Sequence, residues 1–125
     1  MTASARMRRI AAVMGFVSAT LAAMSALHLS GILGGGAEPF DPTHAGVAEA
    51  AICIALALGV FAVLRGSTWA RSAAVASTVF AIAGFVVGLN FTVRGGGVVD
   101  IAYHATILPL LLLVAAALLL RRTPR

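Results

Sequence analysis

The sequence predicts an all-α polytopic membrane protein, a single up-down bundle of four transmembrane helices over residues 1–125. Composition is the first observation: 61% of the residues are hydrophobic, 10% are charged, and the mean hydropathy is +1.04. Nine basic and four acidic residues cannot cover the surface of a soluble domain of this size. The second observation is that polar residues separate four long apolar segments. A single cysteine excludes a disulfide framework.

The four apolar segments lie at about residues 9–33, 42–64, 70–92 and 101–120. Each supplies the roughly 20 residues that a helix needs to cross about 30 Å of hydrocarbon. Asp41 and Pro42 are typical of an N-cap and the first helical position, so we expect the second span to begin there. Asp100 is predicted to cap the fourth span in the same way. The short connection after the second span predicts that spans two and three are antiparallel neighbours.

Arginines indicate the orientation of the spans. The chain has no lysine, and eight of its nine arginines lie in three groups beside apolar segments: Arg6, Arg8 and Arg9; Arg65 and Arg71; Arg121, Arg122 and Arg125. The positive-inside rule places these groups, and both termini, in the cytoplasm. We therefore expect a multi-pass protein of a bacterial cytoplasmic membrane that contacts lipids and no nucleic acid. A cleaved signal peptide is the alternative interpretation of the first segment.

Small residues predict how the helices pack. Ala55 and Gly59 in span two, and Gly84 and Gly88 in span three, have the four-residue spacing that lets membrane helices approach closely. Gly88 and Asn90 lie about 200° apart on a helical wheel. Span three therefore has two faces to bury, and we expect one of them to form a homodimer.

The polar residues are distributed unevenly. Every acidic residue and every histidine falls at or near the non-cytoplasmic end of its segment: Glu38, Asp41, Glu49, Asp100, His28, His44 and His104. Each span also contributes one polar side chain at a similar depth: His28, Glu49, Asn90 and His104. Such side chains cost roughly 2.5–3.5 kcal/mol when charged at the centre of a span, and less near the interface. We therefore expect them to face one another in a shared pocket.

We assign an expected role to each residue of this pocket. Glu49 is expected to be the group that gains and loses a proton, with His104 and His28 as its acid or base partners. Asp100 shares a helix face with His104 and is predicted to orient that imidazole. Arg94 lies behind them as a counter-ion for Glu49 or Asp100. The candidate ligand-binding residues are Asn90, Asp100, Arg94 and Tyr103, of which Tyr103 also suits an interfacial belt.

These roles predict binding of a small lipophilic or ionic ligand, with acid–base chemistry on a lipid-soluble substrate. A metal centre is the alternative. His28, Glu49 and His104 form a ligand set suited to zinc or non-haem iron, and the two histidines could hold a haem. The chain has no HExxH or CxxC spacing, so this prediction rests on a constellation of residues. Glu38 and Phe40, in the preceding loop, are candidates for a lid.

Two further alternatives belong to other functional classes. The chain resembles the small multidrug resistance transporters in size, span number and buried glutamate. That resemblance implies proton exchange for cationic drugs in an antiparallel dimer. Here, however, the glutamate is Glu49 in span two instead of span one, and the arginine bias opposes dual orientation. The last alternative is a structural or assembly subunit whose polar ring only holds the helices in register.

Residues 85–104, FVVGLNFTVRGGGVVDIAYH, resemble a stretch of small four-helix membrane proteins from high-GC bacteria. Abundant Ala, Gly and Arg beside the absence of lysine agrees with such a genome. The resemblance implies the four-helix membrane fold. Since no function is assigned to that group, it implies no catalytic role for any residue.

Overall fold

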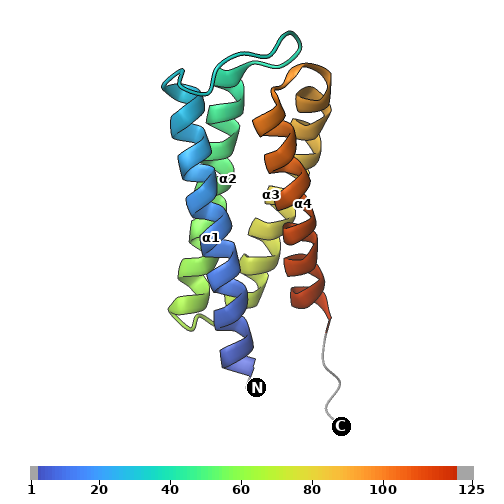
Figure 1. The fold of residues 1–125 in the computed structure, drawn as a ribbon. Coiled ribbons are helices and arrows are strands. Elements are labelled where there is room, and N and C mark those ends of the chain that lie inside the picture. Colours follow the sequence, from blue (N-terminus) through green and yellow to red (C-terminus); the bar gives the residue numbers. More distant parts are fainter. Residues whose placement is uncertain (1–2, 121–125) are drawn as a thin grey trace.

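The computed structural model describes residues 3–120, and these residues form four helices and no strand. The helices are α1 (Ala3–Leu29), α2 (Pro42–Leu64), α3 (Ala70–Gly95) and α4 (Val98–Leu119), as Figure 1 shows. Each of them is long and apolar enough to cross a membrane. The predicted all-α membrane bundle is confirmed, and the fold is that of a multi-pass integral membrane protein.

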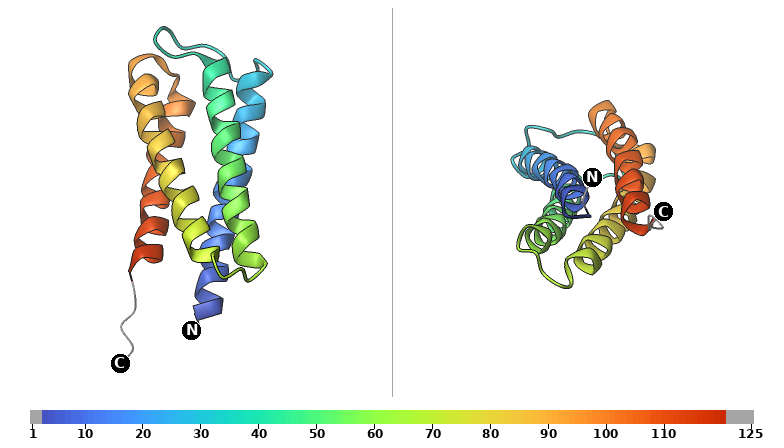
Figure 2. Two further views of the ribbon diagram at one scale, coloured as in Figure 1. Left: turned by 180° about the vertical axis from the view of Figure 1, so that it is seen from behind. Right: turned by 90° about the horizontal axis from the view of Figure 1, so that it is seen from below.

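Consecutive helices run in opposite directions around a common axis (Figures 1 and 2). Two connections, residues 30–41 and residues 96–97, lie at the end that we call the upper end, at the top of Figure 1. The first residues of α1, the last of α4 and the α2–α3 turn lie at the opposite, lower end. Contacts are most extensive between helices that follow each other in the chain, and sparser between α1 and α4.

Helix ends follow local chemistry, although one of the two predicted caps is wrong. Asp41 caps α2 as expected, because its carboxylate accepts from the backbone N–H of Thr43 at 2.8 Å. Asp100 does not cap α4. That helix begins at Val98, its N-cap Gly97 makes no side-chain bond, and Asp100 lies within the first turn. The aspartate is therefore free to point into the bundle.

The core consists of residues from all four helices, including Met14, Leu21, Leu56, Ala81 and Leu111. Glycines let the helices approach. A Cβ on Gly84 would lie 2.6 Å from Ile52 Cδ1, and one on Gly59 would lie 3.0 Å from Met14 Cε. Both positions belong to the predicted small-residue surfaces, which here face neighbouring helices of the same chain.

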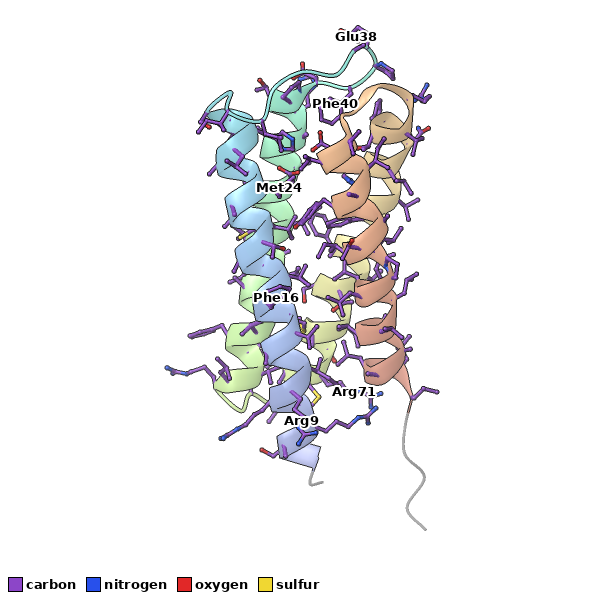
Figure 3. All side chains as sticks on the ribbon, in the orientation of Figure 1. Arg9, Phe16, Met24, Glu38, Phe40 and Arg71 are labelled. Atoms are coloured by element: carbon purple, nitrogen blue, oxygen red, sulfur yellow. The ribbon has the colours of Figure 1, made fainter. Side chains whose placement is uncertain are left out.

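Arginines gather at the lower end, where Arg9 and Arg71 are labelled in Figure 3. Arg71 donates from Nη2 to the Leu118 carbonyl at 2.6 Å, and Arg6 donates to the carbonyls of Ala117 and Leu120. These carbonyls have no partner within the helix because α4 ends there. Two of the predicted topology arginines therefore also cap α4. The third group, Arg121, Arg122 and Arg125, lies outside the described residues.

The loop of residues 30–41 covers the upper end. It begins where Gly31, at φ +78°, ends α1 four residues earlier than predicted. The Ala37 N–H then donates to the Gly95 carbonyl at 2.7 Å, which ties the loop to the end of α3. Phe40 is buried beneath the loop, whereas Glu38 is exposed at its crest (Figure 3). Of the two lid candidates, only Phe40 contacts the interior.

Candidate functional site

Three ionisable side chains meet just below the loop. The His28 ring lies between two carboxylates: Nδ1 is 2.8 Å from Glu49 Oε2, and Nε2 is 2.8 Å from Asp100 Oδ1. His28, Glu49 and Asp100 are 3%, 7% and 5% exposed. They come from α1, α2 and α4. We call this group the carboxylate–histidine triad.

Local packing explains why His28 reaches this position. α2 passes close to α1 at Gly46, where a Cβ would lie 2.7 Å from Leu29 Cγ and 3.2 Å from His28 Cβ. Ser25, one turn before His28, donates to the Gly46 carbonyl at 2.7 Å. Phe40 covers the ring edge to face, with 6.0 Å between the ring centroids. The close approach of α2, the Ser25 hydrogen bond and the Phe40 ring therefore help to position the imidazole, in addition to its two carboxylate partners.

The predicted partnership between Asp100 and His104 is corrected in its detail. The Asp100 carboxylate contacts His28, and only its backbone carbonyl accepts from His104 Nδ1, at 2.8 Å. A carbonyl cannot donate, so Nδ1 carries the proton and Nε2 of the neutral ring is an acceptor. No hydrogen bond to His104 Nε2 is present among the described residues, and this atom lies 3.0 Å from where a Gly88 Cβ would stand.

Glu49 and His104 both line a pocket of about 510 Å³ between α2, α3, α4 and the loop. Its walls are mostly apolar and include Phe80, Phe85 and Phe91 of α3. The buried side also presents Tyr103 and the hydroxyl-bearing Thr92. Glu49 uses only Oε2 in its bond to His28, and Oε1 has no hydrogen-bond partner in the described chain. The pocket thus combines aromatic walls with unpaired polar atoms.

Two of the predicted pocket residues lie elsewhere. Asn90 is exposed, and so is Arg94, whose Nε donates to the Asn90 carbonyl at 3.0 Å. The Arg94 guanidinium lies 5.6 Å from the centroid of the Phe91 ring, on the outside of α3. It pairs with no carboxylate of the described residues, so the expected counter-ion for Glu49 or Asp100 is not found. His44, at the pocket margin, is exposed.

Tyr103 lies beside the site, and its hydroxyl donates a hydrogen bond to α1. Its hydroxyl is 2.8 Å from Thr20 Oγ1, and the Thr20 hydroxyl donates to the Val17 carbonyl at 2.7 Å. Because Thr20 has only one proton and uses it on Val17, Tyr103 must be the donor in this contact. The tyrosine oxygen can therefore only accept a further hydrogen bond.

The residues do not fit the metal centre considered above. Among residues 3–120, no three His, Cys, Asp or Glu side chains converge as a metal-ligand group. Both nitrogens of His28 face carboxylate oxygens, so neither has a lone pair free for zinc, non-haem iron or haem iron. His104 Nε2 is free, but Glu49 and His28 are committed to each other. Cys53 contacts Ser18 of α1 instead.

Sequence reasoning identified His28, Glu49, Asp100 and His104 but missed the residues that shape the site. Gly46 lies three residues before Glu49 on the same helix face, and a small residue there lets the neighbouring helix approach. Phe80, Gly84 and Phe91 follow helical spacing along α3 and form a stripe that contains no polar side chain. No feature of the sequence marked Thr92 as a residue of the pocket.

Comparison with known proteins adds no family to this picture. No protein-family model matches the chain, and neither a curated protein nor a solved structure shows significant similarity to it. The class of protein, a four-helix integral membrane protein with a polar site near one end, therefore rests on the fold and the site.

Proposed function

We propose that this protein binds a small membrane-dissolved molecule in the pocket between α2, α3, α4 and the loop. The observation that carries the proposal is the pairing of aromatic walls with two unpaired polar atoms, Glu49 Oε1 and His104 Nε2. Ligand pockets typically have this composition, with few polar groups set in an apolar surface. An amphipathic molecule would place its apolar body against the phenylalanines and its polar group between the two atoms.

The surroundings of the pocket support access from the bilayer. Several lining residues are exposed on the outside of the bundle: Ala48 on α2, and Phe80, Ala83, Val87 and Phe91 on α3. In a protein whose helices cross a membrane, these residues face lipid. A hydrophobic molecule would therefore reach the pocket sideways between α2 and α3, without passing through water.

A purely structural role is the competing proposal, and the triad itself favours it. His28 joins three helices, and such a network can serve only to hold helices in register. That role, however, needs neither a pocket of this size nor an unpaired oxygen on Glu49. Glu49 Oε1 is not fully enclosed, since Thr78 Oγ1 is the buried side-chain atom without a partner among the described residues, and it is therefore open to a donor group of a bound ligand.

Fluorescence quenching tests the proposal. In a Trp69→Phe background, one variant carries Phe91→Trp in the pocket wall and another carries Val86→Trp, on the outer face of the same helix. Para-bromophenylbutanol, whose bromine quenches indole on contact, is titrated into protein in lipid nanodiscs. We expect saturable quenching at position 91 and only linear, partition-driven quenching at position 86. Linear quenching at both positions would overturn ligand binding and leave the structural role.

A further inference from the structure

The hydrogen bonds of the triad determine its charge. Each short contact between a ring nitrogen and a carboxylate oxygen needs one proton, so the two contacts hold two protons. Those protons lie either both on His28, facing two carboxylates, or one on His28 and one on a carboxyl group. In both arrangements the three side chains together keep one net negative charge. Glu49 Oε1 and Asp100 Oδ2 both lack a hydrogen bond among the described residues, but only Glu49 lines the pocket, so its Oε1 presents that charge there.

No cation of the described chain neutralises this charge. On α3, Arg94 is exposed and turned toward Phe91 and Asn90. On α2, His44 is exposed and its nearest acid is Asp41, at 3.7 Å. On α4, the His104 ring donates to the Asp100 carbonyl and presents a lone pair at Nε2. The lower-end arginines lie at the opposite end of the bundle (Figure 3).

The free polar atoms near Glu49 also share one chemical character. Glu49 Oε1 and His104 Nε2 are acceptors. The Tyr103 hydroxyl donates its proton to Thr20, so its oxygen can only accept a further hydrogen bond. Of the described lining side chains, Thr92 and the exposed His44 at the pocket margin are able to donate as well as accept. A ligand that satisfies these atoms must therefore supply hydrogen-bond donors, and one that matches the charge must be positive.

We infer that the ligand is a lipophilic ammonium compound, an amine that is protonated and carries N–H groups. This inference rests on the proposed pocket function and names the class of its ligand. The ammonium donates to Glu49 Oε1 and His104 Nε2, while the apolar part lies against the phenylalanines of α3. Charge-assisted hydrogen bonds of this kind are about twice as strong as neutral ones, and more so away from water.

A proton competes with the ammonium for the same oxygen. When the triad takes up a third proton, at Glu49 Oε1, its net charge becomes zero and the attraction for a cation is lost. The groups in and around the triad are His28 from α1, Glu49 from α2, Asp100, Tyr103 and His104 from α4, and the uncharged Phe40 from the loop. Because His104 also becomes cationic in acid, both changes weaken ammonium binding as the pH falls.

The same quenching assay tests the inference with matched head groups. Para-bromophenylbutylamine is compared with para-bromophenylbutanol and with the trimethylammonium analogue, which has charge but no N–H. At neutral pH we expect the amine to bind at least about tenfold more tightly than either analogue, as one charge-assisted hydrogen bond implies. Equal affinity of amine and alcohol would overturn the ammonium assignment while leaving the pocket intact. Absence of saturable binding by all three compounds would overturn the pocket itself.

Two isosteric variants locate the charge. In Glu49→Gln, the new amide donates to His28 Nδ1, so the imidazole proton and the negative charge move to the Asp100 side, away from the pocket. In Asp100→Asn the charge stays on Glu49. Both variants retain two hydrogen bonds to His28, so both are expected to fold. The loss of amine affinity should be about tenfold greater in Glu49→Gln than in Asp100→Asn, with Glu38→Gln, an exposed loop acid, as the unchanged control. Equal losses in the two triad variants would contradict the assignment.

Discussion

At the scale of single residues, His28 has the most demanding position in the molecule. Its ring is almost completely buried and both of its nitrogens contact carboxylates from other helices. An imidazole suits this position because its two nitrogens point in different directions and can both carry protons. No other side-chain ring has two nitrogens with which to contact two acids. The orientation of Glu49 in the pocket therefore depends on a residue that does not line the pocket itself.

Replacement of His28 is expected to be costly. In His28→Ala the carboxylates of Glu49 and Asp100 lose their shared donor and stay buried, which destabilises the fold by about 3–5 kcal/mol. Thermal unfolding in detergent measures the loss as a lower midpoint. His44→Ala is the matched control, because that ring is exposed, and should change stability by less than about 0.5 kcal/mol. Equal midpoints for both variants would mean that the triad does not hold the helices together.

At the scale of helices, glycines position the site by setting the distance between neighbours. α1 and α2 pack closely at Gly46, beside His28, and α3 approaches α4 at Gly88, beside His104. Membrane helices have no water to expel from between them, so close packing at small residues provides much of their association. The same contacts that join the helices therefore decide where the polar side chains lie.

Adding a methyl group at Gly46 tests this role. A Cβ there would stand 2.7 Å from Leu29 Cγ, so Gly46→Ala should push α1 from α2 and cost about 1–3 kcal/mol by overpacking. Gly15→Ala adds the same methyl group where the nearest atom, Val60 Cγ2, is 4.0 Å away, and should be tolerated. Detergent melting curves of the two variants make the comparison. A greater loss in Gly15→Ala than in Gly46→Ala would refute the packing argument.

At the scale of the whole molecule, most arginines and the candidate site lie at opposite ends of the bundle. The described arginines other than Arg94 belong to the lower half, and the triad, the pocket and the loop belong to the upper half. The positive-inside rule then predicts that the lower end faces the cytoplasm and the pocket opens toward the outer leaflet. A ligand would thus be collected from the side of the bilayer that meets the cell's surroundings.

Cysteine labelling tests this orientation. In a Cys53→Ala background, Glu38→Cys places a thiol in the loop and Thr68→Cys places one in the α2–α3 turn, both at exposed positions. A membrane-impermeant maleimide added to intact cells should label only position 38, and permeabilisation should expose position 68. Labelling of position 68 in intact cells would reverse the topology. An N-terminal tag retained on the same protein would exclude cleavage of α1 as a signal peptide.

The number and class of the helices were predictable from the sequence because length and hydropathy are local properties. Four apolar stretches of about 20 residues cross a membrane whatever they pack against. The cost of burying ionisable groups also identified His28, Glu49, Asp100 and His104 without coordinates. The Asp41 cap was predictable for the same reason, since its partners are the next few residues of the chain.

The pairing of those polar residues depended on the tertiary structure. A helical wheel placed Asp100 beside His104, but its carboxylate turns to His28, on α1, because the rotation of each helix about its axis is set by its neighbours. The same rotations leave Asn90 and Arg94 exposed and present Gly88 and Thr92 to the interior. Sequence by itself determined which residues were too costly to bury alone. Only the packing of the four helices decided which of them meet, since contacts between distant segments are not encoded in local spacing.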